Sequence, residues 1–285
     1  MHIWCICLLL NKGEKVEILY YIMIFIMGTV FGSFFTLAVY RIPLKKDISH
    51  ERSFCPNCNH KLGFWDLIPI LSYLFAGGKC RYCGQKIRIR YLILEVLSGL
   101  VFLLGYLALN MEFPYIEINK IAFFVSFVFM YVTIAIIAGI DKEYRKIEMS
   151  VLLFGLIMQI IYILYLYIIN KVSIYRYSMY LFIMLFLWII NKVIIKKSGE
   201  SKYLVQILLF LTYIGFCIGG ELLFFVTLVA TLFVIAYTLY AKIKQSFNDE
   251  ADILKENELP QTRIGFFLGI STVLVVIIET FITYM

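Results

Sequence analysis

The sequence predicts an all-α polytopic membrane protein, with about eight transmembrane helices and a zinc-binding loop between the first and the second. Composition gives the class: 62% of the 285 residues are hydrophobic, only 16% are charged, and the mean hydropathy is +0.88. Soluble globular domains do not have such values. Apolar runs long enough to cross hydrocarbon recur along the chain. One long polar segment interrupts them and carries four of the seven cysteines.

The first span is predicted at residues 18–40. Residues 1–17 are an apolar stretch too short to cross a membrane, followed by charged residues. A secretory signal has the opposite order, so we interpret 1–17 as a loosely structured lead-in. Within the span, Gly28, Gly32 and Ser33 are small enough to let a neighbouring helix approach closely.

Residues 91–285 are predicted to form a seven-helix membrane core. Its apolar runs lie at about 91–110, 121–140, 149–169, 177–195, 203–219, 221–241 and 264–284. Each is close to the length of about 20 residues that spans a bilayer. Gly219 and Gly220 permit a tight hairpin between the sixth and seventh helices of the chain.

Basic residues predict the orientation. Residues 41–90 carry ten Lys or Arg against three acids, and the loops at 141–148, 192–202 and 242–263 are also rich in basic residues. With eight spans these loops share one side, which the positive-inside rule makes cytoplasmic. Both chain ends are then expected outside a cell (inner or plasma) membrane. The net charge of +7 is therefore read as a topology signal, and no nucleic-acid partner is expected.

The polar segment at 41–90 contains two C-x-x-C pairs. Twenty-one residues separate the second cysteine of one pair from the first of the next, and the four residues are Cys55, Cys58, Cys80 and Cys83. Four thiolates in this pattern suit one tetrahedral zinc ion. A turn-prone residue follows each pair, Asn59 in one case and Gly84 in the other. Paired disulfides or redox-active thiols are the alternatives, and a cytoplasmic location favours zinc.

Two acids stand where apolar runs meet polar loops. Asp141 ends the third span and Glu200 precedes the sixth, so both are expected at the cytoplasmic boundary. A carboxylate at that depth is costly unless it is paired, hydrated or functional. Two such groups brought together can share one proton and activate a water molecule. The alternative is that both are ordinary interfacial residues among nearby lysines and arginines.

The N-terminal part resembles the type IV prepilin peptidases. The residues that carry the resemblance are GSFFTLAVYRIP at 32–43 and CPNCNHKLGFWDLIPILSYLFAGGKCRYCGQKIRIRYLILEVLSG at 55–99. This family consists of eight-helix membrane aspartyl peptidases. The resemblance implies removal of the leader from type IV prepilins or pseudopilins on the cytoplasmic side. In bifunctional members it also implies methylation of the new N-terminus from S-adenosylmethionine, and the cysteine loop is typical of those members.

The C-terminal half follows the family less closely. Asp141 falls at the first catalytic aspartate, but the usual Pro-Asp is replaced by Ile147-Glu148. The second catalytic aspartate ends a G-x-G-D motif, and here the matching acid is Glu200 in KSGE. A catalytically impaired relative that acts as a membrane scaffold or assembly factor is therefore the alternative function. A transporter is less favoured, because charged residues at mid-bilayer are scarce apart from Glu95.

Overall fold

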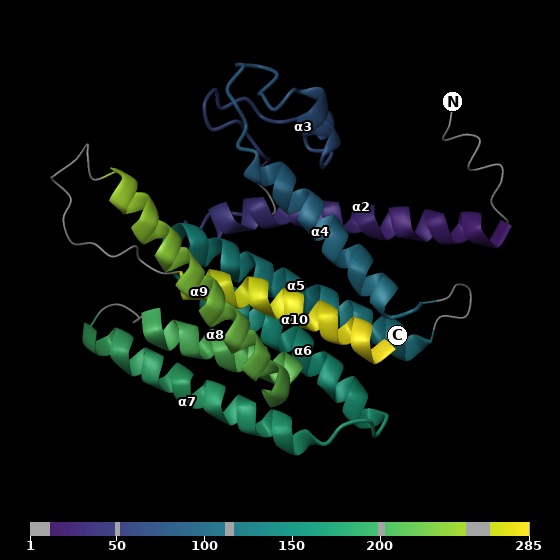
Figure 1. The fold of residues 1–285 in the computed structure, drawn as a ribbon, viewed down its shortest axis with the longest axis vertical. Coiled ribbons are helices and arrows are strands. Elements are labelled where there is room, and N and C mark those ends of the chain that lie inside the picture. Colours follow the sequence, from purple (N-terminus) through teal and green to yellow (C-terminus); the bar gives the residue numbers. More distant parts are fainter. Residues whose placement is uncertain (1–11, 49–51, 112–116, 199–202, 249–262, 285) are drawn as a thin grey trace. The chain divides into compact units, whose positions relative to one another are not determined.

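The computed structural model describes residues 12–48, 52–111, 117–198, 203–248 and 263–284 (Figure 1). Within these ranges the chain is helical, with two isolated β-bridges and no β-strand. It divides into two compact units, one of residues 1–128 and 280–285 and one of residues 129–279.

The predicted all-α membrane fold is confirmed. Seven helices of the described chain are long and apolar enough to cross a membrane. They are α2 (Lys12–Arg41), α4 (Arg90–Ala108), α5 (Ile118–Tyr144), α6 (Met149–Ile168), α7 (Ile174–Ser198), α9 (Gly220–Asn248) and α10 (Ile264–Tyr284). The eighth apolar helix is α8 (Tyr203–Ile218), which has only 16 residues. Each of the eight coincides with a predicted span.

The first unit is built on the packing of α2 against α4, which cross in Figure 1. A Cβ atom at Gly28 would lie 2.8 Å from the Gly99 Cα, and one at Gly32 would lie 2.8 Å from the Glu95 Cα. Contacts this short do not occur between real side chains and backbone. The predicted role of these glycines in close helix approach is thus confirmed, because only glycine lets the two backbones meet here.

The first helix begins earlier than the pattern predicts. α2 starts at Lys12, whereas the first span is predicted from Ile18. The extra turns carry Lys12, Glu14, Lys15 and Glu17. These residues are good helix formers, so a helix that is already stable in the membrane extends through them. The part that meets the criteria for a span is Val16–Arg41.

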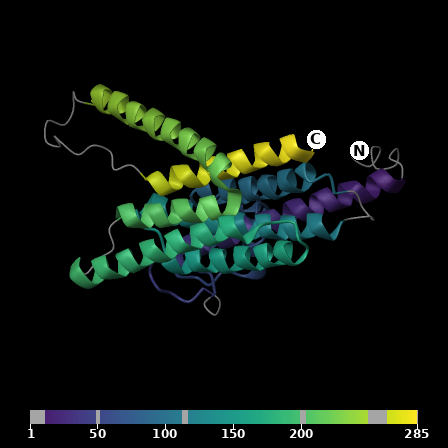
Figure 2. The same cartoon turned by 90° about the horizontal axis from the view of Figure 1, so that it is seen from below.

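The second unit is centred on α8, which contacts α6, α7 and α9. Figures 1 and 2 show α6, α7 and α8 side by side, with α9 inclined to α8. Half of the residues of α8 are buried, and Phe210 and Tyr213 are completely so. Gly219 has a φ of +86°, which is the left-handed conformation that the predicted hairpin between α8 and α9 requires.

Candidate functional site

The cysteine loop contains two similar hairpins, each closed around a C-x-x-C pair. The N–H of Cys55 donates to the His60 carbonyl at 3.0 Å, and the N–H of Cys80 donates to the Gln85 carbonyl at 2.8 Å. The residue after each pair has a positive φ, 56° at Asn59 and 72° at Gly84. Asn and Gly tolerate this conformation best. The local sequence therefore explains why each hairpin turns back tightly behind its second cysteine.

The two hairpins bring the four sulfurs together. The Sγ atoms of Cys55, Cys58, Cys80 and Cys83 all lie within 4.8 Å of one another, and those of Cys55 and Cys83 are 3.9 Å apart. A tetrahedral zinc site with Zn–S bonds of about 2.3 Å has sulfur–sulfur edges of about 3.8 Å. A disulfide needs sulfurs at about 2.05 Å, and all four thiols are free. The cluster thus fits a metal ion and is not a pair of disulfides in this structure.

Hydrogen bonds favour the thiolate form at two cysteines of this cluster, Cys55 and Cys83. The N–H of Gln85, followed by the side-chain amide of Asn57, lowers the pKa of Cys83 to about 6. The N–H groups of Cys58 and Asn57 lower the pKa of Cys55. The His60 N–H acts to lower the pKa of Cys58, but lost hydration and the neighbouring sulfurs of Cys83 and Cys55 raise it to about 11. The protons are shared within the cluster, and a bound cation would displace them.

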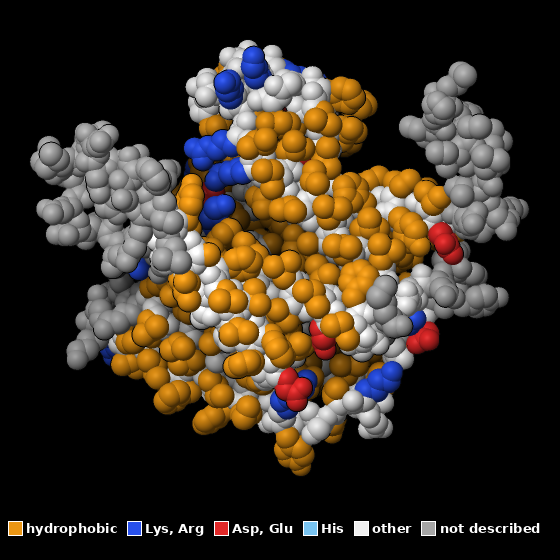
Figure 3. All heavy atoms as spheres, in the orientation of Figure 1, with side chains coloured by type: hydrophobic (Ala, Val, Ile, Leu, Met, Phe, Trp, Pro, Cys, Tyr) orange, Lys and Arg blue, Asp and Glu red, His pale blue; other side chains and the backbone are white. Residues whose placement is uncertain are grey.

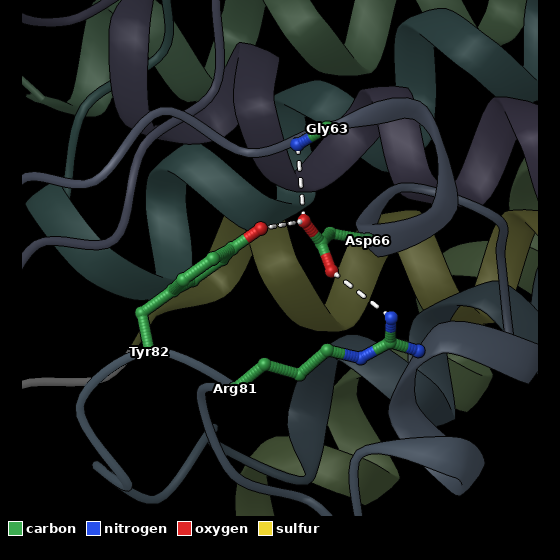
Figure 4. A network of polar contacts seen from close by, with 4 residues as sticks. All are labelled: Gly63, Asp66, Arg81 and Tyr82. Carbon is green, nitrogen blue, oxygen red and sulfur yellow. Dashed lines mark hydrogen bonds and ion pairs between the residues drawn. The ribbon is translucent and has the colours of Figure 1, made fainter.

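Asp66 connects the two halves of the loop (Figure 4). Its Oδ2 accepts hydrogen bonds from the Gly63 N–H and from the Tyr82 hydroxyl, both at 3.0 Å. Its Oδ1 lies 3.6 Å from an Arg81 guanidinium nitrogen. The Tyr82 ring also stacks on His60 at 3.5 Å between centroids. Since Arg81 and Tyr82 stand between Cys80 and Cys83, this carboxylate helps to fix the second hairpin against the segment that follows the first.

Asp141 lies in the second unit, in the last turn of α5, and is completely buried. Its Oδ1 accepts a hydrogen bond from the Tyr203 hydroxyl at 2.7 Å. Its Oδ2 accepts one from the Phe266 N–H at 2.9 Å, at the N-terminal end of α10. Helix N-termini favour negative charge. Two elements far apart in the sequence therefore donate to one carboxylate at the end of a membrane-spanning helix.

Gly265 allows α10 to approach this carboxylate. A Cβ atom at position 265 would lie 3.1 Å from both Cγ and Oδ2 of Asp141. Such a contact is tighter than most real Cβ contacts, so a side chain here would displace the carboxylate from the Phe266 N–H. The close fit explains why a glycine stands at the start of α10.

The same face of α8 also holds the connection between α5 and α6. The Ile147 N–H donates to Gln206 Oε1 at 3.0 Å, and Ile147 is completely buried. Gln206 is one helical turn after Tyr203, so the two side chains lie on one side of α8. The Arg145 guanidinium lies 5.1 Å from the centre of the Tyr203 ring. Asp141 and the loop that follows it are thus both fixed by α8.

Of the two predicted catalytic acids, only Asp141 lies within the described residues. Asp141 is placed by the contacts above, whereas Glu200 lies outside the described residues, between the end of α7 and the start of α8. Glu148, which stands where the family has Asp after Pro, pairs with Lys146 at 2.7 Å. The four cysteines lie in the first unit and Asp141 in the second.

Three contacts of Asp141 and its loop were not predicted from the sequence: those of Tyr203, Gln206 and Phe266. Tyr203 and Gln206 begin an apolar run and read as ordinary residues of a buried helix. Only Gln206 carries a signal in the sequence: it is polar within an apolar run, and a buried amide needs hydrogen-bond partners.

Together the spanning helices and the four-thiol loop define a multi-pass helical membrane protein with a cysteine cluster between its first two spans. Residues 26–109 match the family model described as Bacterial Peptidase A24 N-terminal domain. The matched residues include the second half of α2, the whole cysteine loop and α4. The resemblance to the prepilin peptidases is therefore confirmed.

The similar curated proteins carry the name prepilin leader peptidase/N-methyltransferase. That of Myxococcus xanthus (strain DK1622) is 40% identical over 84 residues, which are 30% of this chain and 25% of the relative. That of Vibrio cholerae serotype O1 is 40% identical over 88 residues, 28% of this chain and 35% of the relative. That of Klebsiella pneumoniae is 37% identical over 109 residues, 36% of this chain and 48% of the relative.

The matched segments thus span less than half the length of these relatives. No solved structure matches the chain.

Proposed function

We propose that this protein is a membrane aspartyl endopeptidase that removes the leader from type IV prepilins or pseudopilins. The observation that carries the proposal is the buried Asp141 carboxylate, which Tyr203 and the Phe266 N–H hold at the end of a spanning helix. A carboxylate buried at this depth is costly, and such groups mark functional sites. The names of the relatives supply the substrate class.

Glu200 is the proposed second acid. It precedes Tyr203 by three residues. Consecutive Cα atoms are at most about 3.8 Å apart, so the Cα of Glu200 is within about 11 Å of the Cα of Tyr203. The Tyr203 side chain reaches Asp141 directly. Chain connectivity therefore permits Glu200 to approach Asp141, as a catalytic pair requires.

In the proposed reaction, ionised Asp141 accepts a proton from a water molecule, whose oxygen attacks the scissile carbonyl carbon. Protonated Glu200 donates a hydrogen bond to the carbonyl oxygen. When the carbon–nitrogen bond breaks, the leaving amine takes the proton that Asp141 received from the water, and the new carboxyl group remains on the leader. The pair shares its protons, so the two acids exchange roles during turnover. Tyr203 and Phe266 each donate one hydrogen bond to Asp141, which leaves lone pairs on both oxygens for water.

Zinc has a structural role in this proposal. Cys55, Cys58, Cys80 and Cys83 would supply all four ligands, and a site closed by four thiolates leaves no position for a substrate. The ion would join the two hairpins and so order the loop between α2 and α4. It takes no part in the proposed peptide cleavage.

The names of the relatives also support a second activity, N-methylation of the new N-terminus with S-adenosylmethionine as donor. The residues of this chain that would hold the donor are not assigned. A hollow of about 180 Å³ in the cysteine loop is lined by Trp65, Ile68, Leu71, Ser72, Phe75 and Arg81. It is smaller than the usual ligand pocket of about 300 Å³ or more and is mostly apolar. It does not fit this donor.

The proposed location is the cell (inner or plasma) membrane, with the cysteine loop and both acids on the cytoplasmic side and both chain ends outside. The excess of Lys and Arg in residues 41–90 supports this sidedness. Cysteine labelling of the intact cell, with single cysteines at the exposed positions 142 and 220, tests it. Opposite sides are expected for these two positions. Labelling of both from the same side would contradict the proposed orientation.

A scaffold or assembly factor is the second candidate. The family match ends at residue 109, before Asp141, and the family's second aspartate is Glu200 here. One experiment separates the two functions: replacement of both acids, as Asp141→Asn with Glu200→Gln, followed by a leader-cleavage assay at equal protein level. If the protein is a peptidase, the unmodified protein is expected to cleave the leader and the double variant is not. The scaffold predicts no cleavage by the unmodified protein either.

A further inference from the structure

The cysteine loop presents large apolar side chains outwards next to its metal-binding hairpins. Phe64 is 75% exposed, Trp65 72% and Phe75 78%. Leu71 and Leu74 are also exposed. These five residues, from the 3₁₀ turn Phe64–Asp66 and the short helix α3 (Leu71–Phe75), are called the α3 apolar face below. Trp65, Leu71 and Phe75 surround one hollow, so the face is contiguous. A contiguous apolar surface of this kind marks an interaction site.

A hydrogen bond fixes the position of the α3 apolar face along the axis of α4. The Ile70 N–H, at the start of α3, donates to Glu95 Oε2 at 2.8 Å. Glu95 is buried five residues after the start of α4, about 7.5 Å along the helix axis. Ile70 has a φ of 62°, which a β-branched residue adopts only when its surroundings impose it. The start of α3 is therefore held beside the first turns of a membrane-spanning helix.

The lipid-facing surface of α4 begins at the same level. Ile89 is 62% exposed, and an exposed apolar stripe follows it at helical spacing, formed by Ile93, Leu97, Leu100 and Leu104. Figure 3 shows apolar atoms over the α3 side of the loop, with Lys and Arg atoms at the top of the loop and down its left edge. The α3 apolar face and this stripe thus lie at the same level along α4.

The positive charge of the cysteine loop also favours contact with a membrane surface. Residues 41–90 carry ten Lys or Arg against three acids, so the loop is attracted to anionic headgroups. Trp and Phe beside basic residues are the composition of segments that lie in the membrane interface.

We propose that the α3 apolar face inserts into the headgroup–acyl boundary of the bilayer that the helices cross, with anionic phospholipid as its partner. Burial of Phe64, Trp65 and Phe75 in lipid removes their apolar surface from water. The insertion holds the four-cysteine cluster at the membrane surface. The inference rests only on the spanning helices and the loop, and it holds whether or not the protein cleaves prepilins.

The test uses the full chain in nanodiscs of anionic phospholipid. Trp4→Phe and Trp188→Phe leave Trp65 as the single tryptophan of the sequence. Phospholipid brominated near the headgroup end of its acyl chains quenches tryptophan on contact, and iodide quenches it from water. Trp65 is expected to lose most of its fluorescence to the brominated lipid and little to iodide. Trp188, 42% exposed on the spanning helix α7 and kept alone in a second variant, is the lipid-contact control.

Two further variants keep the result independent of position 65. In a background without other tryptophans, Phe75→Trp is expected to behave as Trp65 does. Gln85→Trp, exposed on the second cysteine hairpin, is expected to be quenched by iodide instead. If iodide and not brominated lipid quenches both Trp65 and Phe75→Trp, the proposal is wrong. Protection of these two positions by an added prepilin leader peptide would then assign the face to peptide docking.

Discussion

The Tyr203 hydroxyl donates a 2.7 Å hydrogen bond to Asp141 and so joins the first turn of α8 to the last turn of α5. The two residues are 62 positions apart, and the carboxylate is completely buried. Its second oxygen is held by the Phe266 N–H. A carboxylate with this donor set has a fixed position before any substrate arrives. Preorganised geometry is what catalysis by an acid pair requires.

Removal of the Tyr203 hydroxyl is expected to weaken the Asp141 site without changing the fold. Tyr203→Phe leaves a buried carboxylate oxygen short of one donor, which costs about 1–3 kcal/mol. Thermal unfolding in detergent is expected at a lower temperature, and leader cleavage is expected to fall about tenfold or more, since 1.36 kcal/mol corresponds to one factor of ten. Tyr167→Phe, at an exposed position of α6, is the matched control. Equal losses in both variants would contradict the assigned role.

A methyl group at Gly265 tests the approach of α10. Gly265→Ala places a Cβ atom 3.1 Å from Asp141 Cγ, so the carboxylate must shift away from the Phe266 N–H. Shifts of about 1 Å near reacting groups can cost about 100-fold in rate. Cleavage is expected to fall steeply with little change in protein level. Gly63→Ala, where the nearest atom would be 3.6 Å away, is expected to retain full cleavage. Full activity of Gly265→Ala would show that this contact is not needed.

Metal analysis tests the cysteine cluster. Freshly purified protein is expected to contain one zinc per chain, with four sulfur ligands at about 2.3 Å by X-ray absorption. Cys83→Ser is expected to lose most of the metal, whereas Cys217→Ser, in α8 and outside the cluster, is expected to keep it. Two disulfides by mass spectrometry, without zinc, would refute the assignment.

The order of thiol alkylation after chelation follows from the pKa values. A lowered pKa means a thiolate at lower pH, so Cys83, with a pKa of about 6, is mostly ionised at pH 7. Cys58, with a pKa of about 11, is mostly protonated there. Iodoacetamide is expected to modify Cys83 well before Cys58, and the Cys83 rate is expected to drop as the pH falls below about 6, because the thiolate is the nucleophile. Mass spectrometry of time points measures both rates. Equal rates at pH 7 would be the contrary result.

Local features of this fold are readable from the sequence. Apolar runs predict the spanning helices because bilayer thickness sets their length. Asn59 and Gly84 mark the turns of the cysteine hairpins, since few other residues adopt their positive φ. Gly28 and Gly32 predict the close packing that α2 and α4 show. In each case the cause lies within a few residues of the pattern.

The donors to Asp141 could not be predicted in this way. Phe266 is 125 positions from Asp141, and its contribution is a backbone N–H, which every residue except proline has. Tyr203 opens an apolar helix and resembles any buried aromatic residue. Their roles depend on how α8 and α10 pack around α5. Glu200, the predicted second acid, lies outside the described residues and remains a prediction.

Cleavage of a synthetic prepilin by the purified protein in nanodiscs, compared with Asp141→Asn and Glu200→Asp, tests the peptidase proposal most directly. The unmodified protein is expected to cut after the leader glycine. Asp141→Asn is expected to be inactive, because an amide cannot accept the proton from water. Glu200→Asp restores the acid of the resembled family and is expected to match or exceed the unmodified protein. If neither the unmodified protein nor Glu200→Asp cuts any prepilin offered, or if Asp141→Asn cuts normally, the proposed aspartyl peptidase function is contradicted.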